Sequence, residues 1–284
     1  MNKEFSKSWI RMRLPHDNKA RSNLLTSHAN IKNHNLLDIG CGSGNFLIWC
    51  LNNKLIFKEC FLVDSNQRLL DDIKSNIRNN IQKYSIKTRA NKKDFIICNK
   101  DTVISKINVK RSNISNIHKY IHSSSIVSFS ALLDLMSKKS IDSILNFLTD
   151  ENIFFFSLCF DGIIKWNPTH KYDKYILRFF NENQMTNKSM GMALGYKSID
   201  YLKRRADKLN CKFKTCKSPW IVTNNSLPNK KFLQRYLLDI RKALFNMDGI
   251  EKSILREWYE FRHQSIINNK VLLYVGHQDI LLKK

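Results

Sequence analysis

Residues 36–46 read Leu-Leu-Asp-Ile-Gly-Cys-Gly-Ser-Gly-Asn-Phe, and this stretch decides the fold. A short apolar run predicts a buried strand, the glycines predict a sharp turn, and residues 46–55 predict a helix. Glycine lacks a Cβ, so the backbone can bend tightly and a ligand can approach it closely. A helix that starts at such a turn presents free N–H groups and its positive dipole end. The stretch therefore predicts a strand–loop–helix ligand site.

The glycine spacing argues against a dinucleotide site. A dinucleotide loop would follow GxGxxG, but here the third glycine comes one position early and Asn45 fills its place. The observed pattern, DxGxGxG, suits a ligand without a pyrophosphate, whose amino-acid end meets the loop. We expect Asp38 to pair with the ligand's ammonium group and the loop N–H groups to receive its carboxylate.

A second acidic residue supports this interpretation. Asp64 lies 20 residues after Gly44 and ends the apolar run Cys-Phe-Leu-Val-Asp at 60–64. A carboxylate at the tip of a neighbouring strand can accept hydrogen bonds from both hydroxyls of a ribose. The alternative is a structural turn and an incidental surface acid. The glycine loop between two strands, with an acid at the tip of the second, favours the ligand site.

Short apolar strands alternate with helices along the first part of the chain. Strands are expected at 35–39, 60–64, 95–98, 125–129 and 153–159, and helices at 46–55, 69–80 and 141–148. This alternation predicts an α/β fold with a doubly wound, mostly parallel sheet and right-handed crossovers. Later in the chain we expect a helix at 196–209, an extended segment at 211–223, and one or two helices at 232–267 with a break near 247–249. A final strand or hairpin is expected at 271–282.

The motif at 36–46, together with Leu-Val-Asp-Ser-Asn at 62–66, resembles the first two motifs of class I S-adenosylmethionine-dependent methyltransferases. The resemblance covers about residues 30–160. It implies a Rossmann-like sheet of seven strands in the order 3-2-1-4-5-7-6, with the last strand antiparallel. It also implies S-adenosyl-L-methionine as the cofactor at the C-terminal strand ends. The contacts that it implies are Asp38, Gly40, Cys41, Gly42 and Asp64.

Three further features follow from this resemblance. The family's third motif places a polar residue near the adenine, and after residues 95–98 this is Asn99 or Asp101. In the fourth-strand segment at 125–137, Ser128 and Ser130 could contact the methionine end of the cofactor, and Asp134 is expected to start or cap the next helix. The later sequence is similar to a little-characterised bacterial group that often carries a His and an Asp where this chain has Asn183 and Asn187.

We expect a single methyltransferase domain over residues 1–284. Its expected parts are an N-terminal helical segment at 1–30 interrupted at Pro15, a cofactor-binding core at 31–160, a substrate or lid insertion at 161–195, and C-terminal helices and last strands at 196–284. Insertions of this kind often form substrate loops. The expected pocket residues are Phe180, Asn181, Gln184, Lys188 and Trp220.

The composition leaves the partner open. The formal net charge is +24, but only 14 of the 48 basic residues are Arg, and no long basic run occurs. Such a composition fits either the codon bias of an AT-rich genome or a polyanion-binding surface. The seven cysteines form no CxxC pair, so we expect reduced thiols and no metal site. No signal-like or membrane-spanning apolar segment is found, so we expect a soluble, cytoplasmic protein that does not bind membranes.

The sequence indicates the methyl acceptor less clearly than the cofactor. The fourth strand is followed by Ser-Ala-Leu-Leu-Asp, without the (N/D)PP(Y/F) pattern typical of adenine- or glutamine-N methylation. We assign no catalytic residue, because the cofactor supplies an activated methyl group and the protein mainly aligns the reactants. Three hypotheses remain: a small-molecule methyltransferase, an RNA methyltransferase that uses the basic surface, and a non-catalytic cofactor-binding or scaffold protein.

Overall fold

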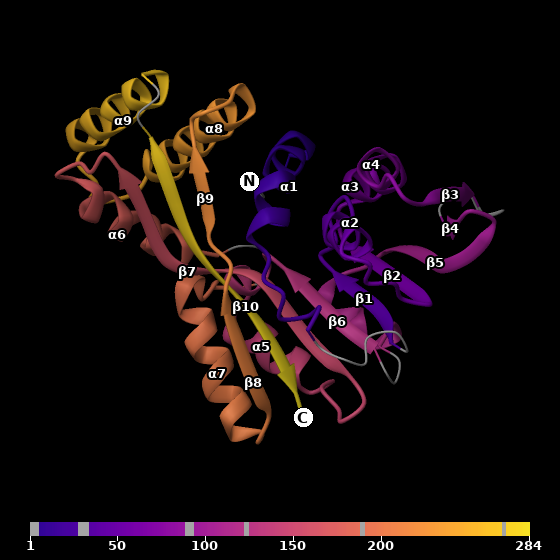
Figure 1. Ribbon diagram of the computed structural model, residues 1–284. Coiled ribbons are helices and arrows are strands. Elements are labelled where there is room, and N and C mark those ends of the chain that lie inside the picture. Colours follow the sequence, from indigo (N-terminus) through magenta and orange to yellow (C-terminus); the bar gives the residue numbers. More distant parts are fainter. Residues whose placement is uncertain (1–5, 28–33, 89–93, 122–124, 188–190, 269–270) are drawn as a thin grey trace.

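The computed structural model describes residues 6–27, 34–88, 94–121, 125–187, 191–268 and 271–284. One mixed sheet organises these residues (Figure 1). Its strands, in spatial order, are β3 (Ser85–Thr88), β4 (Phe95–Asn99), β5 (Thr102–Arg111), β2 (Glu59–Asp64), β1 (Asn35–Ile39), β6 (Ser125–Ser130), β7 (Ile153–Asn167), β10 (Leu272–Lys283) and β8 (Lys212–Lys217), and β9 (Trp220–Thr223) also pairs with β10.

The centre of the sheet has the predicted topology. Strands β5, β2, β1, β6 and β7 are parallel neighbours, β10 is antiparallel to β7, and β8 and β9 are antiparallel to β10. This is the order 3-2-1-4-5-7-6, so the predicted α/β class and order are confirmed. The sheet has ten strands instead of seven, because β3 and β4 are added at one edge and the sixth position is shared by β8 and β9.

The third strand lies elsewhere than predicted. The apolar residues 95–98 form β4, which is antiparallel to β5, and β5 is the parallel neighbour of β2. The prediction was wrong because β5 mixes buried and exposed side chains, whereas Phe95, Ile97 and Cys98 of β4 are fully buried. The apolar run at 95–98 therefore belongs to the antiparallel neighbour of the third strand and not to the third strand itself.

Helices cover both faces of the sheet. The described α-helices are α1 (Lys7–Ala20), α2 (Asn45–Asn52), α3 (Gln67–Leu70), α4 (Ile73–Asn80), α5 (Lys138–Leu145), α6 (Asp173–Gln184), α7 (Ser198–Lys208), α8 (Leu227–Leu244) and α9 (Lys252–Ile267). The apolar side chains of α2 and α4 share one buried cluster with one face of the sheet. Those of α5 and α7 share another with the opposite face. The predicted doubly wound arrangement is thus observed.

Strand β7 belongs to two parts of the molecule. Residues 153–157 pair with β6, while the strand continues to Asn167 along β10 alone. The predicted boundary at 160 therefore falls inside a strand. Beyond it, the end of β7 packs with α6, α8, α9 and β9 around a third apolar cluster. We call residues 158–284 the C-terminal extension.

Helix α1 connects this extension to the rest of the fold. In Figure 1 it stands between α2 on one side and β9 and α8 on the other. It runs unbroken through Pro15, so the predicted interruption there is wrong. The Ser6 hydroxyl accepts a hydrogen bond from the Trp9 N–H, and Leu14 and Asp17 are buried by neighbouring elements. This tertiary packing offsets the hydrogen bond that a proline inside a helix removes.

Most of the helices and strands expected in the C-terminal extension are observed. The break near 247–249 separates α8 from α9, and residues 271–282 form the single strand β10 where a strand or hairpin was expected. All seven cysteines are free thiols. Within the described ranges, none of the helices combines the length and the apolar character needed to cross a membrane.

Candidate functional site

The loop between β1 and α2 has the predicted bend. Gly40, Gly42 and Gly44 adopt positive φ angles of 66°, 55° and 82°, a region that favours glycine. Four of the loop N–H groups are already used inside the protein. Those of Gly40 and Cys41 donate to the Val63 carbonyl at 2.8 and 3.1 Å, that of Gly42 donates to Asp64, and that of Gly44 donates to the Cys41 carbonyl. These four cannot readily receive a ligand carboxylate, contrary to the expectation from the sequence.

Asp64 lies at the end of β2 directly beside this loop. Its Oδ2 accepts from the Gly42 N–H at 2.9 Å, and its Oδ1 accepts from the Asn66 N–H at 2.8 Å. Burial raises the pKa of this carboxyl, while the backbone donors act in the opposite direction. Each carboxylate oxygen can accept a further hydrogen bond. The structure therefore brings the two sequence motifs together, with an acceptor group at their junction.

Asp38 is fully buried in β1, opposite Ser128 of β6. The Ser128 hydroxyl donates to Oδ1, whereas Oδ2 has no hydrogen-bond partner. Burial raises the pKa of Asp38 to about 7. A buried carboxylate oxygen without a donor is costly, and it indicates a place for a ligand group that donates hydrogen bonds.

Arg21 is a site residue that the sequence did not reveal. It follows α1 and is only 7% exposed. Its Nη2 donates to Ser130 Oγ at 2.9 Å and its Nη1 donates to Asn18 Oδ1 at 3.1 Å. Ser128 and Ser130 are two residues apart on β6, so they point to the same face of the sheet. Arg21 and Asp38 therefore contact neighbouring positions of one strand, and we call Arg21, Asp38, Ser128 and Ser130 the polar site.

Two residues beside the polar site have a rare backbone conformation. Ala131, directly after β6, has a φ of 52°, and Leu158 in β7 has a φ of 55°. They adjoin each other, because the Ala131 N–H donates to the Ser157 carbonyl at 2.8 Å. Such strain costs on the order of 1–3 kcal/mol per residue and gathers at functional sites. The sequence carries no signal for it, since neither residue is glycine.

Cys41 lies in the loop as predicted, but its thiol is not a reactive group. It is 6% exposed, and burial raises its pKa well above the usual range. The thiol therefore stays protonated at neutral pH, and this residue contributes backbone to the loop.

Asp101 does not follow the third strand, where the sequence predicted it. Asp101 lies in the tight turn between β4 and β5, before the third strand instead of after it. Its side chain is fully exposed and lies 3.6 Å from the Lys87 ammonium. Asn99 ends β4 at the same turn. The position after β5 is held by Ser112, whose N–H donates to the Asp64 carbonyl at 3.0 Å.

The predicted pocket residues are spread over the C-terminal extension. Trp220 at the start of β9 is buried, and its indole N–H donates to Asp17 of α1 at 3.1 Å. Phe180 of α6 packs edge to face against Phe160 of β7, with ring centroids 6.0 Å apart. Asn181 donates to the Gly162 carbonyl at 3.1 Å.

The other expected residues of this segment do not gather around one point. Gln184 is the last residue of α6 and lies beside Gly195, and Lys188 falls outside the described residues. Asn183 donates to the carbonyl of Ala243 at 3.1 Å, and Asn187 forms a bridge with Met192. The expected set is therefore divided between the surroundings of β7 and the distal end of α6.

Aromatic side chains surround Trp220. Trp9 of α1 stacks on Phe232 and Tyr236 of α8 with centroid distances of 5.5 and 6.4 Å, and Trp220 lies edge to face against both α8 rings. We call these four residues the aromatic cluster. His277 of β10 adjoins it, with 4.8 Å between its ring centroid and that of Trp220. Burial lowers the pKa of His277 to about 3, so the imidazole is neutral at pH 7.

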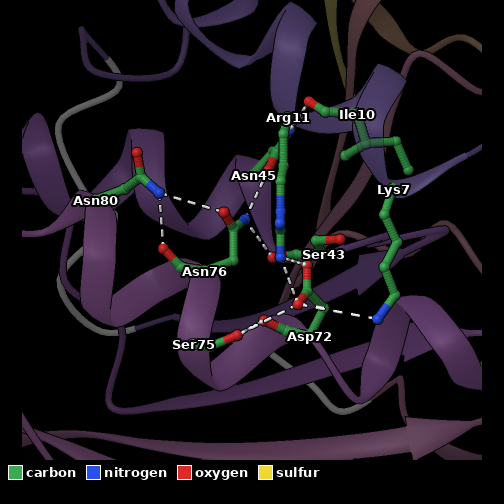
Figure 2. Close-up of polar contacts among 9 residues, drawn as sticks. All are labelled: Lys7, Ile10, Arg11, Ser43, Asn45, Asp72, Ser75, Asn76 and Asn80. Atoms are coloured by element: carbon green, nitrogen blue, oxygen red, sulfur yellow. Dashed lines mark hydrogen bonds and ion pairs between the residues drawn. The ribbon is translucent and has the colours of Figure 1, made fainter.

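Helix α1 also contacts the glycine loop (Figure 2). Arg11 donates to both carboxylate oxygens of Asp72 at 2.7 Å. The side chain of Asn45 donates to the Ile10 carbonyl at 3.2 Å, and that of Asn76 donates to the Ser43 carbonyl at 2.8 Å. One helix therefore touches the loop on one side and the aromatic cluster on the other.

A polar groove of about 760 Å³ opens at the far end of the C-terminal extension. It is lined by Asn167, Thr223, Asn224, Asn225, Ser226, Leu227, Lys230, Val271 and Leu272. Asn167 lies ten positions after Ser157 along β7, which is about 30 Å along a strand. The groove is therefore distinct from the polar site. In the described part of the chain, no group of three or more His, Cys, Asp or Glu side chains could hold a metal ion.

Comparison with known proteins gives a family. Residues 11–157, just over half of the chain, match the model of a family described as a methyltransferase domain. No curated protein matches the chain.

Several solved structures share the general fold. The mycolic acid cyclopropane synthase CmaA1, complexed with SAH and CTAB, is 10% identical with a TM-score of 0.46, over 92% of this chain and 82% of that one. The plantazolicin methyltransferase BamL, in complex with a triazolic desmethylPZN analog and SAH, is 15% identical with a TM-score of 0.41, over 98% of this chain and 86% of that one. A cyclopropane-fatty-acyl-phospholipid synthase-like protein from Lactobacillus casei is 10% identical with a TM-score of 0.48, over 98% and 92%.

Proposed function

The chain belongs to the methyltransferase domain family, and on that premise we propose that it methylates a small molecule. It is an S-adenosylmethionine-dependent methyltransferase, as the motifs at 36–46 and 62–66 imply. The cofactor supplies an activated methyl group. What remains for the protein is to bind the cofactor, to align the acceptor with the methyl carbon, and to exclude water.

The residues at the strand ends fit the cofactor. In the proposed arrangement the Asp64 carboxylate accepts hydrogen bonds from the ribose hydroxyls, while the glycine loop allows close approach of the ligand to the backbone. The unpartnered Oδ2 of Asp38 accepts from the ammonium group of the methionine part. This contact also removes the cost of a buried acceptor that has no donor.

The observation that carries the choice of a small molecule is the position of α1. It lies across the glycine loop and also contacts the aromatic cluster, so buried aromatic rings and the loop are joined by one covering helix. Buried aromatic side chains with few polar groups suit a compact organic acceptor. A polymer such as RNA would instead need an exposed, basic approach to the strand ends. The RNA alternative finds no support in the family match.

The test is transfer of label from methyl-labelled cofactor into a fractionated cell extract. We expect label in the small-molecule fraction with the wild-type protein and none with Asp38→Ala, whose circular dichroism spectrum should be native. Label that enters RNA or protein instead, and depends on Asp38, would contradict the proposed substrate class while leaving the methyltransferase activity intact.

A further inference from the structure

We propose that Arg21 binds the carboxylate of the cofactor's methionine part, on the opposite side of the polar site from Asp38. The proposal rests on the cofactor position given above. It assigns to a residue outside every sequence motif the role that the loop N–H groups were expected to have. Four of those N–H groups already donate within the protein, so fewer backbone donors remain for the carboxylate.

Arg21 is a buried cation without a carboxylate partner. Its two hydrogen bonds go to neutral oxygen atoms of Asn18 and Ser130, and its Nε has none. The rings of Phe46 and Trp49 lie 5.7 and 6.0 Å from its guanidinium carbon and hold it in place. A guanidinium stays charged at neutral pH, and burying a charge without a counter-ion is costly. The arrangement therefore favours an anion from outside the protein.

The nearest acidic residues are occupied by other donors. Asp17 binds Arg13 Nε at 2.8 Å and the Trp220 indole at 3.1 Å. Asp279 accepts from the Ser22 N–H and hydroxyl at 2.8 and 2.9 Å through one oxygen, and from the Leu158 N–H at 2.8 Å through the other. Both carboxylates act on Arg21 only through space. The side chains that could have neutralised Arg21 are thus held in other contacts.

Asp38 is the matching half of the arrangement. It has an unpartnered carboxylate oxygen where Arg21 has an unpartnered N–H, and the two side chains contact Ser128 and Ser130 on one face of β6. Arg21 and Asp38 form no direct ion pair within 4 Å, although each side chain is described. A buried guanidinium and a separate buried carboxyl group with an unpartnered oxygen fit a zwitterion, with its ammonium group on Asp38 and its carboxylate on Arg21. The amino-acid end of S-adenosylmethionine is such a zwitterion.

The experiment measures binding instead of turnover. Calorimetry would compare S-adenosylhomocysteine with its decarboxylated analogue, which keeps the sugar, the base and the amine. We expect the wild-type protein to bind the analogue about tenfold to a hundredfold more weakly, the range typical of a charge-assisted hydrogen-bonded pair. In Arg21→Met this preference should largely disappear, because only the carboxylated ligand loses a partner.

Two further variants serve as controls for Arg21→Met. Arg11→Met removes a second arginine from the same N-terminal segment, one that pairs with Asp72 and not with an acid beside Arg21, and it should keep the wild-type preference. Arg21→Lys retains the charge without the planar fork, so it should keep part of the preference and serves if Arg21→Met does not fold.

The outcomes distinguish a failure of the role of Arg21 from a failure of the cofactor site. Equal affinity of the wild-type protein for both ligands would overturn the role of Arg21. So would an Arg21→Met variant that weakens both ligands by the same factor, since that is the mark of a structural residue. Binding of neither ligand to the wild-type protein would instead contradict the cofactor site itself.

Discussion

Two arginines are buried among the residues that the structure describes, one in each half of the fold, and their surroundings differ. Arg262 of α9, in the C-terminal extension, donates to Asp173 and to the Pro168 carbonyl, and the Trp258 indole N–H donates to the same Asp173 at 2.8 Å. Arg21, beside the cofactor loop, has no carboxylate partner. The Nε atoms of both lack partners, so the difference lies in the counter-ion. The ion pair of Arg262 with Asp173 stabilises the C-terminal extension, whereas the unpaired charge of Arg21 is available to a ligand.

The largest effect should come from breaking the completed pair. Arg262→Met leaves the partly buried Asp173 without its counter-ion, and we expect a loss of about 3 kcal/mol in the free energy of unfolding. Urea unfolding followed by circular dichroism measures it. Arg21→Met, as the matched variant, should lose less than about 1 kcal/mol, because its two hydrogen bonds go to neutral groups and an unmatched charge is removed. Equal losses of unfolding free energy in the two variants would contradict the proposed difference between the two arginines.

The second effect should appear in ligand affinity. Asp64→Ala removes the carboxylate at the tip of β2, and we expect binding of S-adenosylhomocysteine to weaken by about 1.5–3 kcal/mol. Calorimetry on the folded variant measures the loss. Asp101→Ala is the control, since its side chain lies in an exposed turn away from the strand ends. A loss well below this range would place the ribose elsewhere.

A third effect concerns the pH dependence of stability. In the ligand-free protein the pKa of Asp38 is raised to about 7 from an ordinary value of 3.8. Between these two values the folded state holds a proton that the unfolded state has lost, so this group lowers stability as pH rises. The decline levels off above pH 7, where both states have lost the proton.

Asp38→Asn has no such proton to lose. Its stability relative to the wild-type protein should therefore increase from about pH 4 to pH 7, as measured by urea unfolding at several pH values. A difference that stays constant over this interval would show that Asp38 is not the strained acid described here. The variant should also lose affinity for the ammonium group, so stability and binding would change in opposite directions.

The smallest effect should come from the contact that joins α1 to the cofactor half. Arg11→Met removes the ion pair with Asp72. The Arg11 side chain is more than half exposed in this pair. Exposed pairs contribute roughly 0.2–1 kcal/mol, and salt weakens them. A double-mutant cycle with Asp72→Asn, at low and high salt, measures the coupling. If the coupling exceeds that of Arg262 with Asp173, the completed pair of the extension is not the stronger one.

The sequence predicted those parts of the site that depend on local backbone geometry. The glycines after Ile39 and the acid that ends β2 are both signals within one strand–loop–helix unit, and the structure brings them together. The sheet order followed from the same resemblance. These features could be found because each depends on residues that are close in sequence or on a repeated pattern of strands and helices.

The missed features depend on contacts between distant residues. Arg21 lies 109 positions from Ser130, and nothing in its own neighbourhood distinguishes it from other basic residues. Asp101 was misplaced because the apolar run before it forms a hairpin strand instead of the third strand. The aromatic cluster combines residues of α1, β9 and α8, so no single segment of the sequence contains it.

Strand β7 has a consequence for how this protein can be divided. Its first five residues are the outer neighbour of β6, and the rest is a partner of β10 alone. A fragment cut at residue 157, where the family match ends, would present the buried stretch Phe154–Phe156 at a bare sheet edge. Such edges invite aggregation. Exchanging acceptor-binding halves between relatives would therefore require a junction that carries β7 and β10 together, so that the covalent break falls in a loop and not within a shared strand.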